Sequence, residues 1–279
     1  MLEMRSNVGF GAAINRAWDL FSAADLATLN DDAIASPGWL GALTDAAERY
    51  PEAGMFASQV TLAGSERLDS AGMLLCADGS SKQRGHSEPV STFAAPEDVL
   101  LPSASAALYR AQMLREAGAF DPKFFLYCED TDLGLRAQRA GWQCRYVPDA
   151  KVKHRYSHSA GRISALKAYY VERNRLFLVV KNYPLLSLLW VPVAAIVRYA
   201  WHVIFLIRGT GAAAQFAAES RAGWRLPWFV LRAHLALLRH LPRLLRERQA
   251  IASGARLSNS CFRRLLKLHS ISPRRIAQY

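Results

Sequence analysis

Short apolar runs alternate with amphipathic stretches over residues 1–183. The apolar runs have strand length and end at polar or turn residues, whereas the stretches between them have the spacing of helices. We expect strands at Ala24–Leu29, Ala53–Leu62, Leu68–Cys76 and Ser103–Tyr109, with extended pieces at Trp142–Val147 and Lys151–His154. We expect helices at Val8–Trp18, from Ser36-Pro37 to Tyr50, at Thr131–Ala140 and at Ile163–Tyr183. Interleaved strands and helices predict an α/β domain.

The pattern changes at Leu185, where 23 almost entirely apolar residues follow as far as Ile207. This run is long enough to cross a bilayer. Pro192, Arg198 and His202 interrupt it, and a central arginine costs roughly 2.5–3.5 kcal/mol on insertion scales. A single span and an interfacial helix both remain open, and we favour the interfacial one.

A second basic and apolar helix is expected from Leu226 to Arg248. Helical spacing gathers five arginines on an arc of about 60°, namely Arg225, Arg232, Arg239, Arg243 and Arg246, with Val230, Leu237, Leu241 and Leu245 largely opposite. Such helices lie in the headgroup plane of anionic membranes. The alternative is an ordinary helix packed on the domain with its basic face in water.

Charge divides the chain of 279 residues at the same place. Residues 1–184 carry 20 basic and 21 acidic side chains, whereas residues 185–279 carry 15 basic and 2 acidic ones. Aromatic residues do not alternate with the basic ones as in single-strand binders, so we expect no nucleic acid partner. The four cysteines have neither zinc-ligand nor disulfide-framework spacing, and a reducing cytoplasm is the simplest compartment.

Three groups of residues in the first part could carry chemistry. They are Asn30-Asp31-Asp32, Glu129-Asp130-x-Asp132, and His154. Carboxylates and one imidazole that converge at the carboxyl ends of strands could hold Mg²⁺ or Mn²⁺. Taken singly, each is more often a turn, a helix cap or a surface residue.

Five motifs, in one order, resemble the family 2 glycosyltransferases of the GT-A fold, and most of all the rhamnosyltransferase type. They are Asn7-x-Gly-Phe-Gly-x-Ala-x-Asn15, Leu29-Asn-x-Asp32, Gly118-x-Phe-Asp-x-x-Phe-Phe-x-Tyr-x-Glu-Asp-x-Asp-Leu133, Val152-x-His154 and Tyr169-Tyr-x-x-Arg-Asn-Arg175. The resemblance implies a nucleotide-diphospho-sugar transferase with a Rossmann-like α/β domain. It also implies a glycan or polyprenyl-linked acceptor.

The resemblance assigns donor binding to the first two motifs, at Asn7, Gly9, Gly11, Asn15, Asn30 and Asp32. Asp32 matches a metal-binding aspartate, and His154 matches a further metal ligand. A divalent cation, Mn²⁺ or Mg²⁺, would stabilise charge on the leaving diphosphate. The open alternative for His154 is a surface histidine between Lys153 and Arg155.

The third motif implies the acceptor side of the site. Asp130 matches the catalytic base of inverting enzymes, because an acceptor hydroxyl needs a carboxylate to take its proton. Phe125, Tyr127, Glu129 and Asp132 are expected to contact the acceptor. Asp132 is also expected to cap the helix that starts at Thr131.

The family has donor-base-binding strands before the first motif, and this sequence starts almost at that motif. We therefore expect a partial, N-terminally truncated GT-A domain over residues 1–183 and membrane-associated helices over residues 184–279. The favoured function is sugar transfer at the cytoplasmic face of the cell membrane, on an anionic surface. The alternative is a donor-deficient, non-catalytic membrane-bound partner.

Overall fold

The computed structural model describes residues 2–21, 25–155, 165–220 and 223–278, which form two compact units. Unit 1 comprises Met1–Leu74, Gln83–Ser159 and Gly254–Ser258, and unit 2 comprises Leu75–Lys82, Ala160–Ser253 and Asn259–Tyr279. This division differs from the boundary predicted at 183–184. The long helix that we had placed in the first domain, Ala165–Asn182, packs against the helix Leu226–Ser253 and belongs with it in unit 2.

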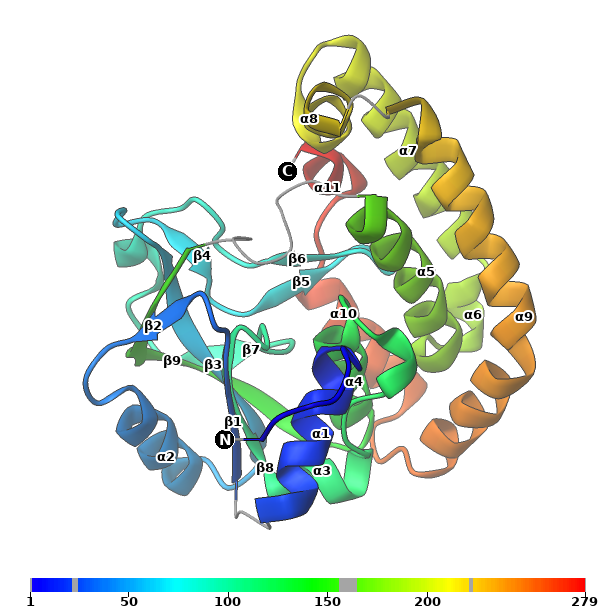
Figure 1. Ribbon diagram of the computed structural model, residues 1–279. Coiled ribbons are helices and arrows are strands. Elements are labelled where there is room, and N and C mark those ends of the chain that lie inside the picture. Colours follow the sequence, from blue (N-terminus) through cyan, green and yellow to red (C-terminus); the bar gives the residue numbers. More distant parts are fainter. Residues whose placement is uncertain (1, 22–24, 156–164, 221–222, 279) are drawn as a thin grey trace. The chain divides into compact units, whose positions relative to one another are not determined.

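Unit 1 is built on a seven-stranded mixed sheet (Figure 1). Its strands are β1 (Asp25–Leu29), β2 (Ala33–Ala35), β3 (Ala53–Leu62), β4 (Leu68–Ser70), β7 (Glu97–Val99), β8 (Ala106–Arg110) and β9 (Gln143–His154). The main order is β1-β8-β3-β9-β2, with β4 paired to β3 and β7 paired to β9. Among the described strand pairs of this sheet, only β3 and β9 are parallel. The two remaining strands, β5 (Met73–Leu75) and β6 (Ser81–Gln83), form a separate two-stranded sheet.

Helices cover both faces of the sheet, as Figure 1 shows. They are α1 (Phe10–Phe21), α2 (Trp39–Arg49), α3 (Ala111–Ala117) and α4 (Glu129–Arg139). Successive side chains of a strand point to opposite faces, so Met55 of β3 joins the core under α1, α3 and α4, whereas Phe56 joins the core under α2. The predicted α/β fold class is therefore confirmed.

The strand directions bring the carboxyl ends of β1, β3 and β9 to one edge of the sheet. Because β8 is antiparallel to both β1 and β3, and β9 is parallel to β3, the strands β1, β3 and β9 run the same way. Their carboxyl ends lie at one edge, together with the beginning of β8. The Asn30–Asp32 turn follows β1, and His154 ends β9. Open α/β sheets bind ligands at this edge.

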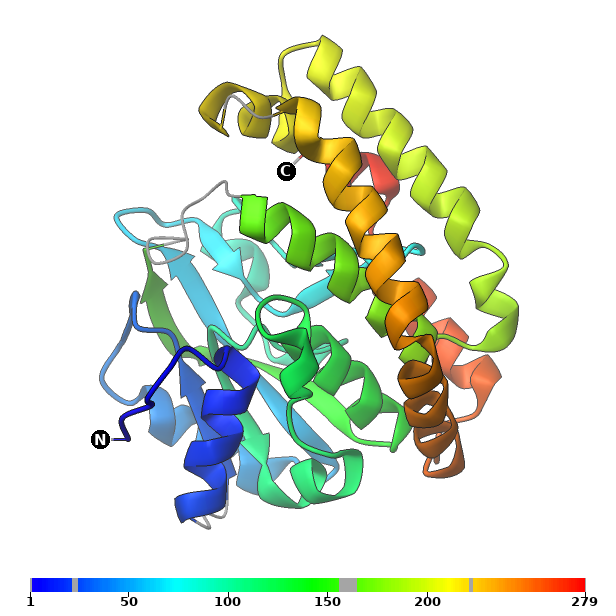
Figure 2. The same ribbon diagram turned by 45° about the vertical axis from the view of Figure 1, so that its right-hand side comes forward.

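Unit 2 is helical (Figures 1 and 2). Its helices are α5 (Ala165–Asn182), α6 (Leu185–Leu188), α7 (Val191–Ile207), α8 (Gly211–Ser220), α9 (Leu226–Ser253), α10 (Asn259–Leu268) and α11 (Pro273–Gln278). The longest pair, α5 and α9, packs together, and α7 packs against α8 and α11. By length and composition, residues Leu185–Ile207 could cross a membrane. Three short 3₁₀ turns complete the described structure, at Val90–Phe93, Pro122–Phe124 and Gly223–Arg225.

Some predicted boundaries were wrong. The strand expected at Leu68–Cys76 is broken at Ala71-Gly72, where Gly72 has a φ of 101° that favours glycine. The two extended pieces expected after residue 142 form one strand, β9, whose register with β3 shifts between Ser58 and Gln59. The beginning of the long helix expected at Ile163 lies outside the described residues. The sequence pattern also missed the short strands β2, β6 and β7, which are too short to show an alternation.

Candidate active site

A chain of carboxylates and imidazoles lies at the carboxyl edge of the sheet in unit 1. His154 Nε2 lies 2.9 Å from Oδ1 of Asp32, and His154 Nδ1 lies 2.7 Å from Oδ2 of Asp69 in β4. The side-chain amide nitrogen of Asn30 lies 3.5 Å from the same Nε2. Asp32 and His154 have side chains only 9% and 8% exposed. The structure thus brings together the two residues that were predicted to bind a metal.

Asp69 fixes how the His154 ring is presented. Asp69 is buried, and its carboxylate accepts the hydrogen bond of Nδ1–H, so Nε2 is the nitrogen that faces Asp32. Burial disfavours the charged form of His154, but the hydrogen bond and charge of Asp69 and the charge of Asp32 outweigh it. The pKa of His154 therefore lies above its ordinary value. Burial also raises the pKa of Asp69, but its hydrogen bonds to His154 and His86 lower it more.

The donor set of Asp32 and His154 suits a divalent cation. An oxygen and an imidazole nitrogen are a donor set that suits Mn²⁺ better than Mg²⁺. The second nitrogen of His154 donates to a carboxylate, which is the usual arrangement of a metal-binding histidine. Among the described residues, no group of three or more His, Cys, Asp or Glu side chains is placed to hold a metal ion.

Asp130 lies at the same edge and is connected to the Asn30 turn through the segment just before β8. Its Oδ2 accepts a hydrogen bond from the backbone N–H of Ala104 at 3.2 Å, and its Oδ1 accepts one from the N–H of Thr131 at 2.6 Å. The next residue of that segment, Ser105, accepts a hydrogen bond through its carbonyl from the N–H of Asn30 at 2.9 Å. One backbone segment thus contacts both Asp130 and the turn that carries Asp32.

Glu129, which is buried, and Asp130, which is half-buried, form an acidic pair at the start of α4. Burial, and then the charge of Asp130, raise the pKa of Glu129 to about 8. Burial also raises the pKa of Asp130, against the lowering effect of the N–H groups of Ala104 and Thr131. Oε2 of Glu129 is buried without a hydrogen-bond partner among the described residues. Carboxylates with raised pKa values are stronger bases once they lose their protons.

Asp132 does not have the position that the sequence suggested. It is fully buried, and its Oδ2 accepts a hydrogen bond from Nε of Arg136 at 2.9 Å, one turn along α4. Arg136 in turn donates to the carbonyl oxygens of Ala117, Gly118 and Ala119. Helix α4 begins at Glu129 rather than at Thr131, and Cys128 is its N-cap. The expected cap role of Asp132 is wrong, and its expected acceptor contact stays a prediction.

The loop before α4 has an unusual backbone. Phe125, Tyr127 and Cys128 have φ values of 64°, 69° and 64°, in the left-handed region that favours glycine. Three such residues in one short loop store strain, and strain of this kind gathers at functional sites. Phe125 and Tyr127 are half-buried next to Asp130 in sequence, so their expected acceptor contacts stay a prediction.

The Asn7-to-Asn15 motif contacts the loop before α4, and its expected donor contacts stay a prediction. Gly9 has a φ of 86°, and a Cβ there would lie 2.2 Å from the carbonyl oxygen of Phe125. Asn15 forms two hydrogen bonds with the backbone of Phe120, and a Cβ on Gly11 would overlap the same residue. The motif therefore holds the loop that precedes α4. The side chain of Asn7 accepts a hydrogen bond from the N–H of Gly9.

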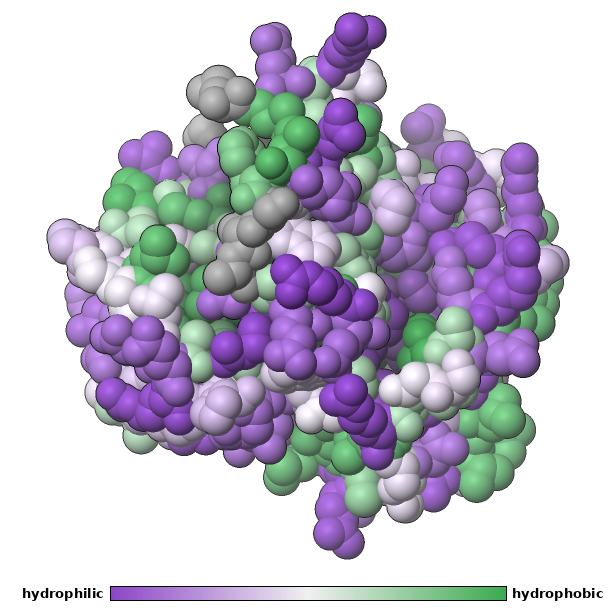
Figure 3. All heavy atoms as spheres, turned by 90° about the horizontal axis from the view of Figure 1, so that it is seen from below, coloured by the Kyte–Doolittle hydropathy of each residue, from purple (hydrophilic) through white to green (hydrophobic). Residues whose placement is uncertain are grey.

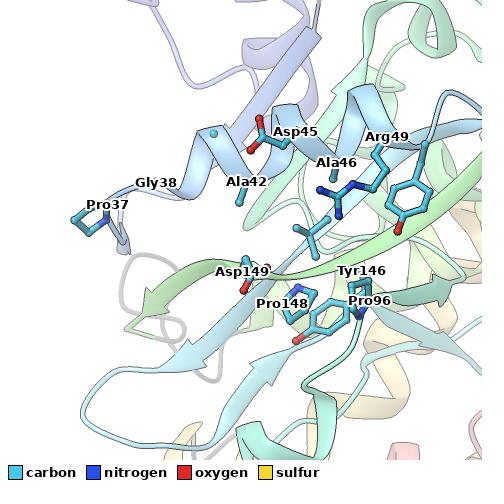
Figure 4. Close-up of a pocket in the computed structure, with 13 residues that line it drawn as sticks. Pro37, Gly38, Ala42, Asp45, Ala46, Arg49, Pro96, Tyr146, Pro148 and Asp149 are labelled. Atoms are coloured by element: carbon cyan, nitrogen blue, oxygen red, sulfur yellow. The ribbon is translucent and has the colours of Figure 1, made fainter.

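A separate pocket of about 470 Å³ lies between α2 and β9 (Figure 4). Asp45 and Arg49 of α2 line it, with Tyr146, Pro148 and Asp149 of β9. None of the predicted site residues lines this pocket. The candidate active site is therefore the carboxyl edge of the sheet and not this pocket.

Sequence reasoning missed Asp69, the backbone of Ala104 and Arg136. Asp69 lies inside a run that reads as a buried strand, and a charged residue in such a run is a signal that it has a buried partner. The N–H group of Ala104 has no signature in the sequence. Arg136 is four residues after Asp132, a helical spacing that predicts an ion pair.

A family model described as "Glycosyltransferase like family 2" matches residues 3–176. The chain belongs to this family. Its matched region contains every predicted site residue and nearly all of unit 1. The resemblance to family 2 glycosyltransferases noted from the five motifs is thereby confirmed.

Two curated relatives are named N-acetylglucosaminyl-diphospho-decaprenol L-rhamnosyltransferase, from the CDC 1551 and H37Rv strains of Mycobacterium tuberculosis. Each is 32% identical over 58% of this chain, and the chain spans 60% of the length of each relative. Among solved structures, this chain is similar to GalNAc-T7 crystallised with UDP, GalNAc and Mn²⁺, with 12% sequence identity and a TM-score of 0.51. The match covers 64% of this chain and 36% of the GalNAc-T7 chain. At that identity the likeness shows the fold, which is the GT-A fold of glycosyltransferases.

Proposed function

We propose that this protein transfers a sugar, L-rhamnose as in the name of its relatives, from a nucleotide-diphospho-sugar to a glycan on a polyprenyl diphosphate. The relatives' name describes an N-acetylglucosaminyl-diphospho-decaprenol acceptor. The observation that carries the proposal is the backbone segment Ala104-Ser105, which contacts both Asp130 and the Asn30 turn beside the Asp32–His154 pair. A base and a phosphate-binding pair at one edge are what an inverting transferase needs.

In this proposal, Asp32 and His154 hold Mn²⁺ or Mg²⁺, and Asn30 contacts the donor beside them. The cation supplies Lewis-acid stabilisation of the leaving diphosphate. Asp69 holds the His154 ring so that Nε2 faces the donor. A GalNAc-T7 structure with UDP and Mn²⁺ supports a divalent cation in this fold.

Asp130 is the proposed general base. It accepts the proton of the acceptor hydroxyl while that oxygen forms its bond to the anomeric carbon, on the face opposite to the leaving diphosphate. The N–H groups of Ala104 and Thr131 orient its carboxylate. Phe125 and Tyr127 would form the wall against which the acceptor sugar packs.

We place this activity at the cytoplasmic face of the cell membrane, on an anionic surface. A polyprenyl-linked acceptor lies in a membrane, and residues 185–279 carry 15 basic and 2 acidic side chains. The alternative function, a non-catalytic membrane-bound partner, gains no support from the comparisons.

The test is a transfer assay with purified protein, labelled nucleotide-diphospho-L-rhamnose and N-acetylglucosaminyl-diphospho-polyprenol. We expect labelled lipid product with Mn²⁺ present and loss of product with EDTA. Panels of other nucleotide sugars extend the assay to the donor class. The proposal is wrong if the folded protein neither forms product from any nucleotide sugar nor hydrolyses any of them.

A further inference from the structure

Helices α6 and α7 of unit 2 have an inverted distribution of polar and apolar residues. Surface helices of water-soluble proteins normally turn polar residues outward. Here the outward side of Leu185–Ile207 is apolar, and Ile196 is 67% exposed and Ile207 is 81% exposed. The other large exposed residues on this side include Trp190, Val193, Val197 and Val203. They recur at helical spacing, so they form one continuous side of α7.

The one charged residue inside this helix points the other way. Arg198 is 7% exposed, and its Nε lies 2.6 Å from Oδ2 of Asp78, while its Nη2 lies 2.9 Å from Oε2 of Glu172 in α5. Arg175 pairs with the same two carboxylates. All four residues belong to unit 2. Two positive and two negative buried charges therefore balance within the unit.

This network opposes a transmembrane position for α7. A helix that crosses a bilayer meets lipid on every side that has no protein partner, and charges inside it must stay paired. If α7 left unit 2 to span a membrane, Arg198 would lose both carboxylates in the hydrocarbon region. Asp78 and Glu172 would each lose a buried partner at the same time. The apolar side of α7 can meet lipid without any of these losses.

Helix α9 adds a second exposed apolar stripe with arginines beside it. Trp228, Leu231, Leu235 and Leu238 are exposed at helical spacing, from 49% to 65%. The exposed arginines Arg225, Arg232, Arg239 and Arg246 follow at intervals of seven residues along a neighbouring line. Figure 2 draws α7 and α9 running alongside one another. Figure 3, which views the molecule from below, shows hydrophobic patches among hydrophilic side chains on its right-hand side.

The chemistry of this surface favours a lipid headgroup layer over a protein partner. Exposed tryptophans with apolar neighbours prefer the membrane interface. Arginines beside an apolar stripe complement the phosphates of anionic lipids, and exposed charges of one sign oppose the approach of a second copy. We call the exposed apolar residues of α6, α7 and α9 the lipid face.

We propose that unit 2 binds an anionic bilayer through this lipid face, with α7 and α9 lying in the plane of the headgroups, and that the pairs of Arg198 with Asp78 and Glu172 keep α7 from spanning. The proposal rests on the membrane association proposed above, and it specifies the residues and the depth. Sugar transfer and lipid binding are measured separately, so either can fail alone.

The experiment measures flotation of the purified full chain with vesicles of phosphatidylcholine alone or with 30% phosphatidylglycerol. The variants Ile196→Glu and Leu235→Glu place a charge on the lipid face. The matched control is Leu40→Glu, because Leu40 is 49% exposed on α2 of unit 1. Thermal melts check that all three proteins fold as the wild type does. Alkaline carbonate extraction of membranes from expressing cells tests the depth.

We expect the wild type and Leu40→Glu to float with the phosphatidylglycerol vesicles and each lipid-face variant to partition at least about tenfold less. Carbonate should release the wild type. Retention after carbonate would overturn the in-plane position in favour of a span. Flotation that is equal in all variants would overturn the assignment of the face. Absence of flotation, together with self-association that the same variants abolish, would assign the surface to a second copy and overturn the proposal.

Discussion

The same substitution at the two aspartates near the start of α4 should change different properties. At Asp130 it should lower the transfer rate, and at Asp132 it should lower the stability. Asp130→Asn removes the proposed base. Burial raises the pKa of the Asp130 carboxylate, and the substitution puts a neutral side chain of the same shape in its place. We expect a loss of about 10²–10⁴-fold in transfer rate with little change in melting temperature. Asp132→Asn removes the partner of Arg136 and should act on stability first.

The size of the Asp132→Asn effect follows from its burial. Asp132 is fully buried, Arg136 is 8% exposed on its side chain, and the pair is 2.9 Å apart. Removing one partner of a buried ion pair costs about 3–5 kcal/mol, because the other charge stays buried. For a unit of roughly 150 residues, each kcal/mol lowers the melting temperature by about 2–4 °C, so a fall of about 6–20 °C is expected.

Differential scanning fluorimetry and the transfer assay on the same preparations separate the two effects. Activity is compared at a temperature at which both variants are folded. A folded Asp132→Asn variant that loses more activity than Asp130→Asn would transfer the base role to Asp132. A large fall in melting temperature for Asp130→Asn would show that Asp130 has a structural role and would refute its assignment as the catalytic base.

Three further outcomes are expected from the same site. Asp32→Ala should abolish Mn²⁺ binding measured by calorimetry, and unchanged binding would remove the metal assignment. Asp69→Asn should weaken Mn²⁺ binding by about 10–100-fold, because it loosens the His154 ring, whereas Asp98→Asn, at an exposed ion pair, should leave it unchanged. Burial and the charge of Asp130 raise the pKa of Glu129 to about 8, so the folded protein binds this proton more tightly than the unfolded chain does. Stability should therefore fall as pH rises from the ordinary glutamate range towards 8, and Glu129→Gln should flatten this stability curve in denaturation measured at several pH values.

The sequence patterns predicted the long elements well because their alternation extends over many residues. The strand Ala53–Leu62 is observed with the predicted bounds, and the Ser36-Pro37 start leads into α2 at Trp39. The short strands were not predicted, because three residues are too few to show an alternation of apolar and polar positions. The break in the apolar run from Leu68 depends on the backbone conformation of Gly72.

The candidate site could be predicted only where a motif names a side chain. Asp32 and His154 were predicted from separate segments, and the parallel directions of β1 and β9 bring them together. Asp69 was missed because its role depends on a pairing between β3 and β4 that no local pattern indicates. The Gly9 and Asn15 motif was interpreted as donor-binding, yet its close contacts are to the backbone of Phe125 and Phe120, which only the fold shows.

Arg198 shows the same limit in unit 2. The apolar run Leu185–Ile207 contains a central arginine, and composition alone leaves a span and a surface helix both open. The partners that decide between them, Asp78 and Glu172, come from distant positions in the chain.

The anomeric configuration of the product tests the central claim most directly. NMR spectroscopy of the glycan formed by the wild-type protein, compared with the nucleotide-sugar donor, reports on which face of the sugar the acceptor attacked. A single base at Asp130 predicts inversion of configuration at the anomeric carbon and a transfer rate that falls by about 10²–10⁴-fold in Asp130→Asn. A product with retained configuration, or one that forms at the wild-type rate without the Asp130 carboxylate, would contradict the account.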